Sequence, residues 1–251
     1  MIGGIQKMRF QVNADWFNQR LADHGPVYME THTGQLIVEP WNALSSLLML
    51  IPALFWLFRI RREQGNNGLL YFVICLIMAG GIGSAIFHGF RASVVFLLMD
   101  VLPSAILTLT LSIFFWIKVL KKWWYIFFIL IPLFGIRFLF WGNLPEHDSI
   151  NLSYFITGIS VGLPLIILLI QSKFNNWQVL VLAIVSFAFA LFFRQIDQFP
   201  ISYLPMGTHF LWHSFSAVGA YFILDYLYWM TRAKSTSDHY GQTAAGLPGL
   251  K

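Results

Sequence analysis

Three histidines in the apolar part of the chain have the placement of a metal site. His209 and His213 are four residues apart, so on a helix both imidazoles lie on one face, one turn from each other. Such a pair suits two ligands of one zinc ion. Because the chain has seven histidines, the pair alone is a weak signal. A third histidine, His88, lies at the end of another apolar segment and strengthens it.

The depth of these histidines in a membrane favours a functional site. His88 ends the second apolar segment and His209 begins the seventh. If consecutive segments cross in alternating directions, all three imidazoles fall at the same level. Three imidazoles with a fourth position open are typical of a catalytic zinc site rather than a structural one. The alternative is that the histidines form hydrogen bonds between helices, although an ionisable residue within a membrane more often serves a function.

Ser84 and Asp100 have the chemistry that would complete a hydrolytic site. Ser84 lies four residues before His88, on the same helix face, and Asp100 lies early in the third apolar segment. A buried carboxylate without a partner is costly, whereas a carboxylate beside a metal-activated water can act as a general base. The alternatives are helix packing or a hydrogen bond to a carbonyl for Ser84, and a charge favoured by the helix dipole for Asp100.

A group of glycines precedes His88 and favours close helix packing. Gly80, Gly81 and Gly83 lie within about two turns of the histidine. Small residues let neighbouring helices approach closely in membranes. Tight packing is a sufficient explanation for these glycines, and it would also help to hold His88 in place.

The elements that position these residues are long apolar segments. The chain is 57% hydrophobic and 11% charged, whereas soluble domains carry about 25% charged residues. A membrane-spanning helix needs about 20 mostly apolar residues. Seven segments qualify: Trp41–Phe58, Leu69–His88, Val94–Ile117, Trp123–Trp141, Ile150–Ile170, Trp177–Phe193 and Thr208–Met230. The sequence predicts an all-α integral membrane protein. It would comprise an extramembrane segment over 1–40, a seven-transmembrane-helix bundle over 41–232 and a disordered tail over 233–251.

Basic residues predict the orientation of this bundle. They follow the first, third, fifth and seventh segments, as Arg59, Arg61, Arg62, Lys118, Lys121, Lys122, Lys173, Arg232 and Lys234. The positive-inside rule therefore predicts an N-terminus outside and a C-terminus in the cytoplasm. The same clustering between apolar segments argues against nucleic-acid binding, despite a net charge of +5.

Two further features restrict the chemistry and the compartment. The single cysteine, Cys75, excludes an intramolecular disulfide and a thiolate metal cluster. The N-terminal residues lack the apolar stretch of a signal peptide. With the small size of the chain, this slightly favours a bacterial inner membrane over a eukaryotic endomembrane.

Five stretches together resemble the alkaline ceramidases, which belong to a superfamily of seven-helix membrane hydrolases that includes the adiponectin-receptor-like proteins. They are Glu39-Pro-Trp-Asn-Ala-Leu-Ser45, Gly81-Ile-Gly-Ser-Ala-Ile-Phe-His88, Asp100, Phe193-Arg-Gln-Ile-Asp197-Gln-Phe199 and His209-Phe-Leu-Trp-His213. The resemblance implies zinc on His88, His209 and His213, with Ser84 and Asp100 around the activated water. It also implies hydrolysis of a ceramide-like lipid amide to a fatty acid and a sphingoid base.

The family resemblance also includes a calcium-binding pattern before the first helix, Asp-Trp-x-Glu-x-Asn, completed by a later glutamate. Asp15, Trp16 and Glu39 match this pattern, whereas Asn18 replaces the glutamate and Arg20 stands at the asparagine position. An arginine cannot be a cation ligand, and Ca²⁺ needs about 6–8 oxygen ligands. We therefore expect calcium dependence to be weakened or lost.

Two other functions fit the same sequence. The protein could hydrolyse a different lipid amide or an ester, because helix packing rather than the histidine motif selects the substrate. It could also be a non-catalytic receptor or transporter with a structural metal. Against a transporter, the sequence shows no inverted repeat and no paired broken helices. Against a receptor, Ser84 and Asp100 would have no evident role.

Overall fold

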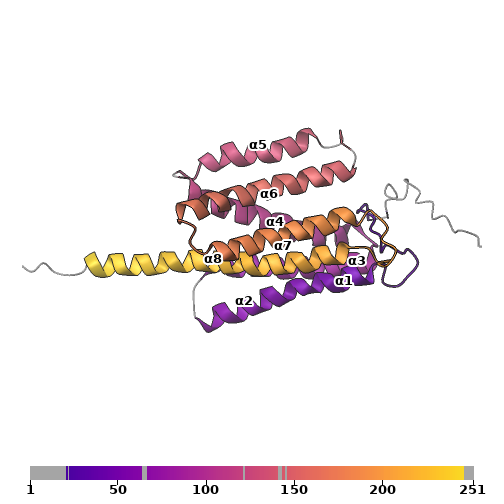
Figure 1. Ribbon diagram of the computed structural model, residues 1–251, viewed down its shortest axis with the longest axis horizontal. Helices are drawn as coiled ribbons and strands as arrows, with labels where there is room; N and C mark the ends of the chain where they lie inside the picture. Colours follow the sequence, from indigo (N-terminus) through magenta and orange to yellow (C-terminus); the bar gives the residue numbers. More distant parts are fainter. Residues whose placement is uncertain are drawn as a thin grey trace, which may run out of the picture.

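The chain forms antiparallel helical rods in a computed structural model that describes residues 21, 23–63, 67–120, 122–140, 143–144 and 146–245 (Figure 1). No strand occurs among these residues. The elements are α1 Pro40–Ser46, η2 Leu47–Met49, α2 Leu50–Arg62, α3 Gly68–Phe90, α4 Val94–Val119, α5 Tyr125–Leu139, α6 Glu146–Gln171, α7 Trp177–Ile196 and α8 His209–Ala245. The prediction of an all-α fold is confirmed.

The first rod is continuous from Pro40 to Arg62, although it contains a short 3₁₀ segment. Pro40 lies at the first helical position, where a missing N–H costs nothing. Pro52 lies inside the rod and cannot donate to the carbonyl of Leu48. A tighter 3₁₀ turn, Leu47–Met49, contains Leu48 and lies just before this proline in the rod. The hydrogen bonding of the rod therefore changes where the proline leaves a carbonyl without its helical partner.

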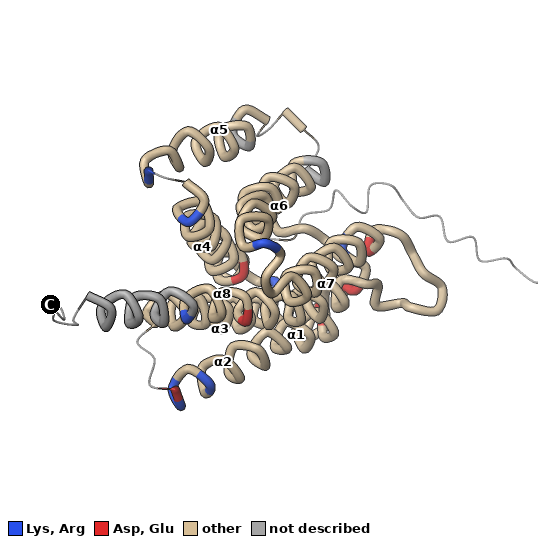
Figure 2. The backbone as a smooth tube through the Cα atoms, turned by 60° about the vertical axis from the view of Figure 1, so that its left-hand side comes forward, with Lys and Arg blue, Asp and Glu red and all other residues tan. Residues whose placement is uncertain are grey.

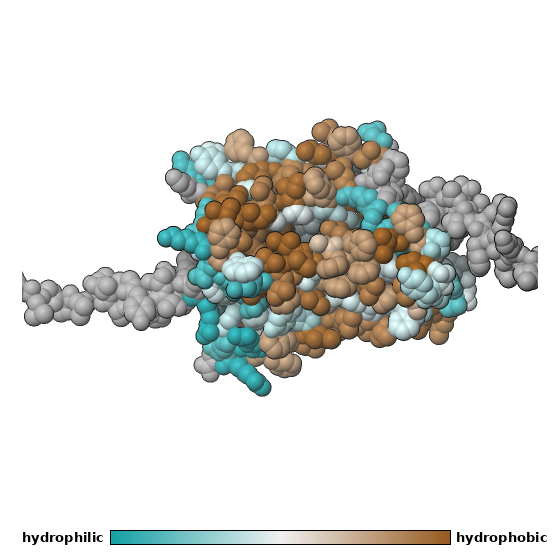
Figure 3. Space-filling view, in the orientation of Figure 1, coloured by the Kyte–Doolittle hydropathy of each residue, from teal (hydrophilic) through white to brown (hydrophobic). Residues whose placement is uncertain are grey.

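Five helices are long and apolar enough to cross a membrane, which agrees with a multi-pass protein. They are Pro40–Arg62, Gly68–Phe90, Val94–Val119, Ser149–Gln171 and Trp177–Ile196. In the space-filling view, hydrophobic side chains cover the middle of the visible face and hydrophilic ones gather towards its two ends (Figure 3). This distribution is the one expected of a surface that contacts lipid.

Two helices differ from the predicted spans. The apolar part of α5, Tyr125–Ile136, is shorter than the predicted span Trp123–Trp141. Helix α8 begins at His209, close to the prediction, but it runs to Ala245. Residues 233–245 are therefore helical, whereas the sequence analysis predicted a disordered tail there. No proline interrupts these residues, and a polar composition does not by itself end a helix. Residues 246–251 lie outside the described part of the chain.

Helix α3 lies between two close neighbours at the level of the histidines. Gly81 faces the first rod, where an added Cβ would lie 2.8 Å from the Cβ of Met49. Gly83 faces α4, where an added Cβ would overlap the backbone carbonyl of Met99. These contacts bring the first rod and the start of α4 against the end of α3 that carries His88.

We expect Gly83→Ala to destabilise the protein, because the backbone of α4 occupies the space that the methyl group needs. Overpacking of this kind costs about 1–3 kcal/mol, occasionally more. Gly89 in the same helix is a matched control, since its added Cβ would have no neighbour within 4 Å. Thermal unfolding in detergent should show a lower Tm for Gly83→Ala than for Gly89→Ala. Equal Tm values would mean that the two helices can separate at no cost.

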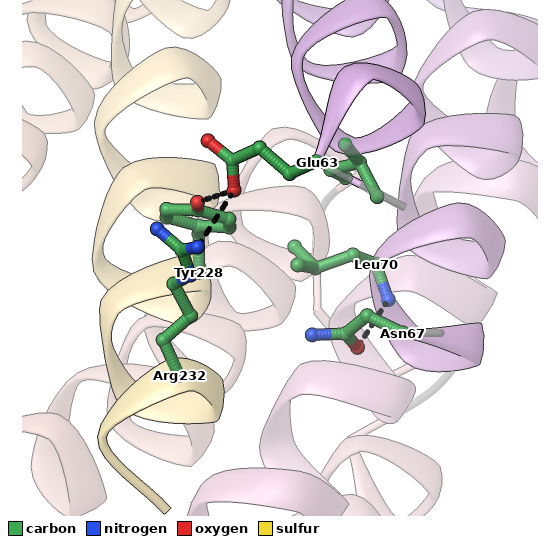
Figure 4. Close-up of a pocket in the computed structure, with 6 residues that line it drawn as sticks. Glu63, Asn67, Leu70, Tyr228 and Arg232 are labelled. Carbon is green, nitrogen blue, oxygen red and sulfur yellow. Dashed lines mark hydrogen bonds and ion pairs between the residues drawn. The ribbon is translucent and has the colours of Figure 1, made fainter. Parts of the chain in front are cut away.

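The end of the bundle away from the histidines is tied together by polar side chains (Figure 4). The Tyr228 hydroxyl of α8 donates to Glu63, whose carboxylate also lies 3.4 Å from the guanidinium of Arg232. Asn67 caps α3 through Leu70 and donates to Thr231 of α8 at 2.7 Å. These contacts join α2, α3 and α8 around a small cavity of about 60 Å³.

Candidate metal centre

The three predicted histidines meet at one end of the bundle. His88 comes from the last turn of α3, and His209 and His213 come from the first two turns of α8. All three are buried, with 1%, 3% and 5% of their surfaces exposed. One ring nitrogen from each lies within 4.8 Å of the others. The prediction that they lie close enough to hold one metal ion is confirmed.

His88 is oriented by a buried ionic network. Its Nδ1 forms a hydrogen bond with Glu39, whose other carboxylate oxygen accepts from Arg91 at 2.5 Å. Arg91 in turn donates to both oxygens of Asp23, at 2.6 and 3.1 Å. A ligating histidine commonly donates its second N–H to a carboxylate, which fixes the ring and raises its basicity. The network thus leaves the Nε2 of His88 for a metal.

The pKa of the Glu39 carboxyl is lowered in this network. Desolvation by itself would raise the pKa of Glu39, but the hydrogen bond and charge of His88 and the charge of Arg91 outweigh it and leave the pKa below its usual value. Arg91 takes a left-handed conformation, with φ of 47°, directly after α3. That turn directs the guanidinium back towards Glu39 and Asp23.

His213 is held by the start of the first rod. Its Nδ1 lies 2.9 Å from the hydroxyl of Ser45, 3.1 Å from that of Ser46 and 3.1 Å from the carbonyl oxygen of Asn42. These partners surround one ring nitrogen, so the opposite nitrogen is left for a metal. Glu30 positions the rod itself, because its carboxylate accepts from the first free N–H groups of α1 at Trp41 and Asn42.

His209 provides the strongest indication that a metal fits this site. Its Nδ1 is buried and has no hydrogen-bond partner among the described residues. A buried polar atom without a partner costs about 1–3 kcal/mol, and a bond to a metal would remove that cost. The ring of Tyr28 lies against His209, with 3.9 Å between ring centroids, and closes the site from the loop side.

Asp197 positions His209 through the backbone. Its carboxylate accepts from the N–H groups of Thr208 at 2.6 Å, His209 at 2.9 Å and Met29 at 3.3 Å. It therefore fixes both the start of α8 and the loop that carries Tyr28. With its oxygens committed to three backbone donors, Asp197 is a positioning residue rather than an alternative base.

Ser84 and Asp100 lie together beside the histidines. Ser84 is buried one turn before His88, and its hydroxyl lies near the carboxylate of Asp100. The Ser46 hydroxyl lies 3.1 Å from that of Ser84. Asp100 is half-buried and interacts electrostatically with His88. The close contact at Gly83 brings the backbone of Asp100 against α3 and so makes this pairing possible.

The residues of the calcium pattern are only partly within the described chain. Asp15, Trp16 and Asn18 lie outside it. Glu39 lies within it, and its two oxygens contact His88, Arg91 and Thr31, the last at 2.5 Å. The guanidinium of Arg91 therefore already supplies a positive charge to this carboxylate.

We expect added calcium to leave the activity unchanged, because Arg91 and His88 occupy the Glu39 carboxylate and Arg20 stands in the pattern. The measurement is turnover in micromolar free Ca²⁺ against turnover with a calcium-selective chelator. Magnesium at the same concentration is the control for a general effect of divalent cations. A several-fold stimulation specific to calcium would contradict this expectation.

Several residues of the site escaped the sequence analysis. Asp23, Tyr28 and Arg91 lie in loops, where no periodic pattern distinguishes them. Asn42, Ser45 and Ser46 gave a usable signal, since they are polar residues grouped at the start of an apolar segment. Glu39 was singled out as a calcium ligand, whereas the structure places it against His88.

The chain matches no protein-family model. A comparison with curated proteins likewise gives no match. The function is therefore inferred from the residues of the site.

Proposed function

We propose that the protein is a zinc-dependent membrane amidohydrolase that cleaves the amide bond of ceramide or a related lipid amide, releasing a fatty acid and a sphingoid base. The observation that carries the proposal is the buried cluster of three histidines beside the Ser84–Asp100 pair. Three imidazoles with an open fourth position suit catalytic zinc. A bound zinc ion would polarise the amide carbonyl and lower the pKa of a water molecule.

Asp100 and Ser84 have complementary roles in this reaction. Asp100 accepts a proton from the attacking water as the new C–O bond forms. A protonated Asp100 no longer competes for the Ser84 hydroxyl, which then donates to the amide oxygen where negative charge develops. The C–N bond breaks as Asp100 returns the proton to the leaving nitrogen. One carboxylate thus serves as base and then as acid.

The helix arrangement supports a substrate that comes from the bilayer. Helix α7 packs against α8, whereas α6 packs against α4 and α5. The space-filling view shows a recess between α6 and α7 (Figure 3). Apolar side chains of α4 near Asp100, including Val95, Leu98 and Leu102, are exposed. An acyl chain entering between these helices would approach Asp100 through an apolar passage.

The proposed orientation places the metal centre at the outer side of the membrane. Basic residues gather at the ends of α2 and α4, in the α6–α7 turn and on α8 (Figure 2), as Arg59, Arg61, Arg62, Lys118, Lys122, Lys173 and Arg232. At the histidine end of the described backbone, the acidic residues Asp23, Glu30, Glu39, Asp100, Glu146, Asp148 and Asp197 outnumber the basic residues Arg91, Arg137 and Arg194. The positive-inside rule then places the basic end in the cytoplasm.

Cysteine labelling tests this orientation. In a Cys75→Ala background, we expect a membrane-impermeant maleimide to label Ser149→Cys from outside intact cells and to label Ser235→Cys only after the membrane is opened. The two positions lie at opposite ends of the bundle, so each is the control for the other. Labelling of Ser235→Cys from outside would reverse the orientation and leave the metal centre itself unaffected.

Fatty-acid release by the purified protein tests the function. We expect release from ceramide to stop with a zinc chelator and to return when zinc is added. An ester with the same acyl chain distinguishes an amidase from a general lipid hydrolase. A protein that binds zinc and is stabilised by it, yet hydrolyses neither the amide nor the ester, would instead have a structural metal.

A further inference from the structure

Arg194 is a charged residue near the end of a membrane-spanning helix, and its side chain is directed towards α6. It lies in the last turn of α7, and its guanidinium is 4.5 Å from the ring of Tyr154 in α6. Tyr154 packs edge-on against Trp212 of α8, with 5.2 Å between ring centroids. Trp212 directly precedes His213 in the chain. The guanidinium on α7 therefore reaches across to α6, where Tyr154 contacts the residue of α8 that precedes His213.

The charge of Arg194 acts on residues of the site itself. It lies within electrostatic range of the metal-ligand candidate His209 and of Tyr28, whose tilted ring lies 3.9 Å, centroid to centroid, from that of His209. Tyr28 also interacts with Tyr154 and Asp100. Long basic side chains near helix ends often extend into water, whereas the guanidinium of Arg194 lies over the ring of Tyr154.

Arg194 forms no ion pair with a carboxylate in the described part of the chain. Asp197, three residues further along the chain, is committed elsewhere, because its carboxylate accepts from three backbone N–H groups. Arg91, at the same end of the bundle, has both Asp23 and Glu39 as partners. A half-buried guanidinium at the end of a membrane-spanning helix is costly without such a counter-ion. Among the described side chains, Arg194 has the ring of Tyr154 as its partner and no carboxylate, so its guanidinium can still bind an anion.

Resting on the function proposed above, we propose that Arg194 binds an acidic group on the polar portion of the lipid amide, so that the preferred substrates are anionic N-acyl lipids. A guanidinium forms paired, charge-assisted hydrogen bonds with carboxylate or phosphate. A hydrophilic patch interrupts the apolar surface beside the ends of α6 and α7, next to the recess through which a lipid would enter (Figure 3). In this arrangement the acyl chain lies between the helices, and the acidic group lies at the membrane surface beside Arg194.

Two matched substrate pairs test this preference with the full-length protein in uncharged detergent. N-oleoylglycine is compared with N-oleoylethanolamine, and ceramide 1-phosphate with ceramide, so that carboxylate and phosphate are distinguished. We expect kcat/KM to favour the acidic member of at least one pair. Arg194→Gln should lower that preference about 10–100-fold, as loss of a charged hydrogen bond does, and Arg194→Lys should restore part of it. Arg62→Gln, which changes an exposed arginine at the other end of the bundle, should leave the preference unchanged.

Binding to the Asp100→Asn protein, measured by titration calorimetry, gives a readout that needs no turnover. Tighter binding of N-oleoylglycine than of N-oleoylethanolamine, abolished by adding Arg194→Gln, would support the anion site even if no substrate is hydrolysed. In that case only the proposed hydrolase function would fail. Hydrolysis without any preference for the acidic member, or a preference that survives Arg194→Gln, would overturn the role of Arg194 alone.

Discussion

Alanine at His88, His209 or His213 is expected to remove the bound metal and, with it, all measurable hydrolysis. In the described part of the chain, each histidine supplies one of three candidate ligand atoms within 4.8 Å of one another. Two imidazoles leave a zinc ion without the coordination that catalytic sites use. Metal analysis of the purified variants should show about one zinc per chain in the wild type and a large loss in each variant.

A matched control separates loss of the metal from loss of the fold. His32 is an exposed histidine in the loop before α1, so His32→Ala should keep both zinc and activity. Helical content by circular dichroism should remain similar in all four variants, because helix packing does not depend on one imidazole. Zinc retained at wild-type level by all three site variants would rule out this cluster as the metal centre.

Asparagine at Asp100 is expected to abolish most of the activity while the metal stays bound. The side chain is nearly isosteric, so the contact between α3 and α4 should survive, but an amide cannot accept the proton of the attacking water. General acid–base catalysis contributes about 10²–10⁴-fold to the rate. The loss of activity should lie near the upper end of this range, because Asp100 both accepts the proton of the water and returns it to the leaving nitrogen. Ser84→Ala should cost less, about 10²–10³-fold, as removal of one oxyanion donor does.

The order of these two variants is part of the prediction. Asp225→Asn is a matched control, since Asp225 is a half-buried aspartate of α8 about three turns beyond His213. It should retain turnover. Near-normal turnover in Asp100→Asn with zinc bound would make Asp100 structural. The base would then have to come from the substrate or from the solvent, since Asp197 is committed to the start of α8.

The histidine cluster was predictable from the sequence, because helices that cross a membrane in alternating directions fix the depth at which each helix end lies. Once His88 ends one apolar segment and His209 begins another of opposite direction, the bundle must bring them to the same level. The lengths of the helices were less predictable. Helix α5 is short and α8 long because composition marks where a helix can meet lipid, and it does not mark where the backbone stops being helical.

The hydrogen bonds and ion pairs that hold the histidines in place were not predictable from any local sequence pattern. Glu39 and His88 are 49 positions apart, and Asp23 and Arg91 are 68 apart. Such pairs depend on how a loop folds over the end of the bundle, and that follows from tertiary contacts rather than from helical periodicity. Glu39 illustrates the consequence, because the calcium-binding pattern singled it out while its observed partners are a histidine and an arginine.

The position of α8 along the chain also determines when the metal centre is assembled during biosynthesis. His88 leaves the ribosome more than a hundred residues before His209 and His213, with α4 to α7 in between. Until α8 enters the membrane and packs beside α3, the site has a single imidazole and no capacity to retain zinc. If the cluster holds zinc as proposed, metal acquisition follows the synthesis of α4 to α8. A polypeptide interrupted anywhere before His213 would then stay metal-free, and its zinc content would report on how far synthesis has proceeded.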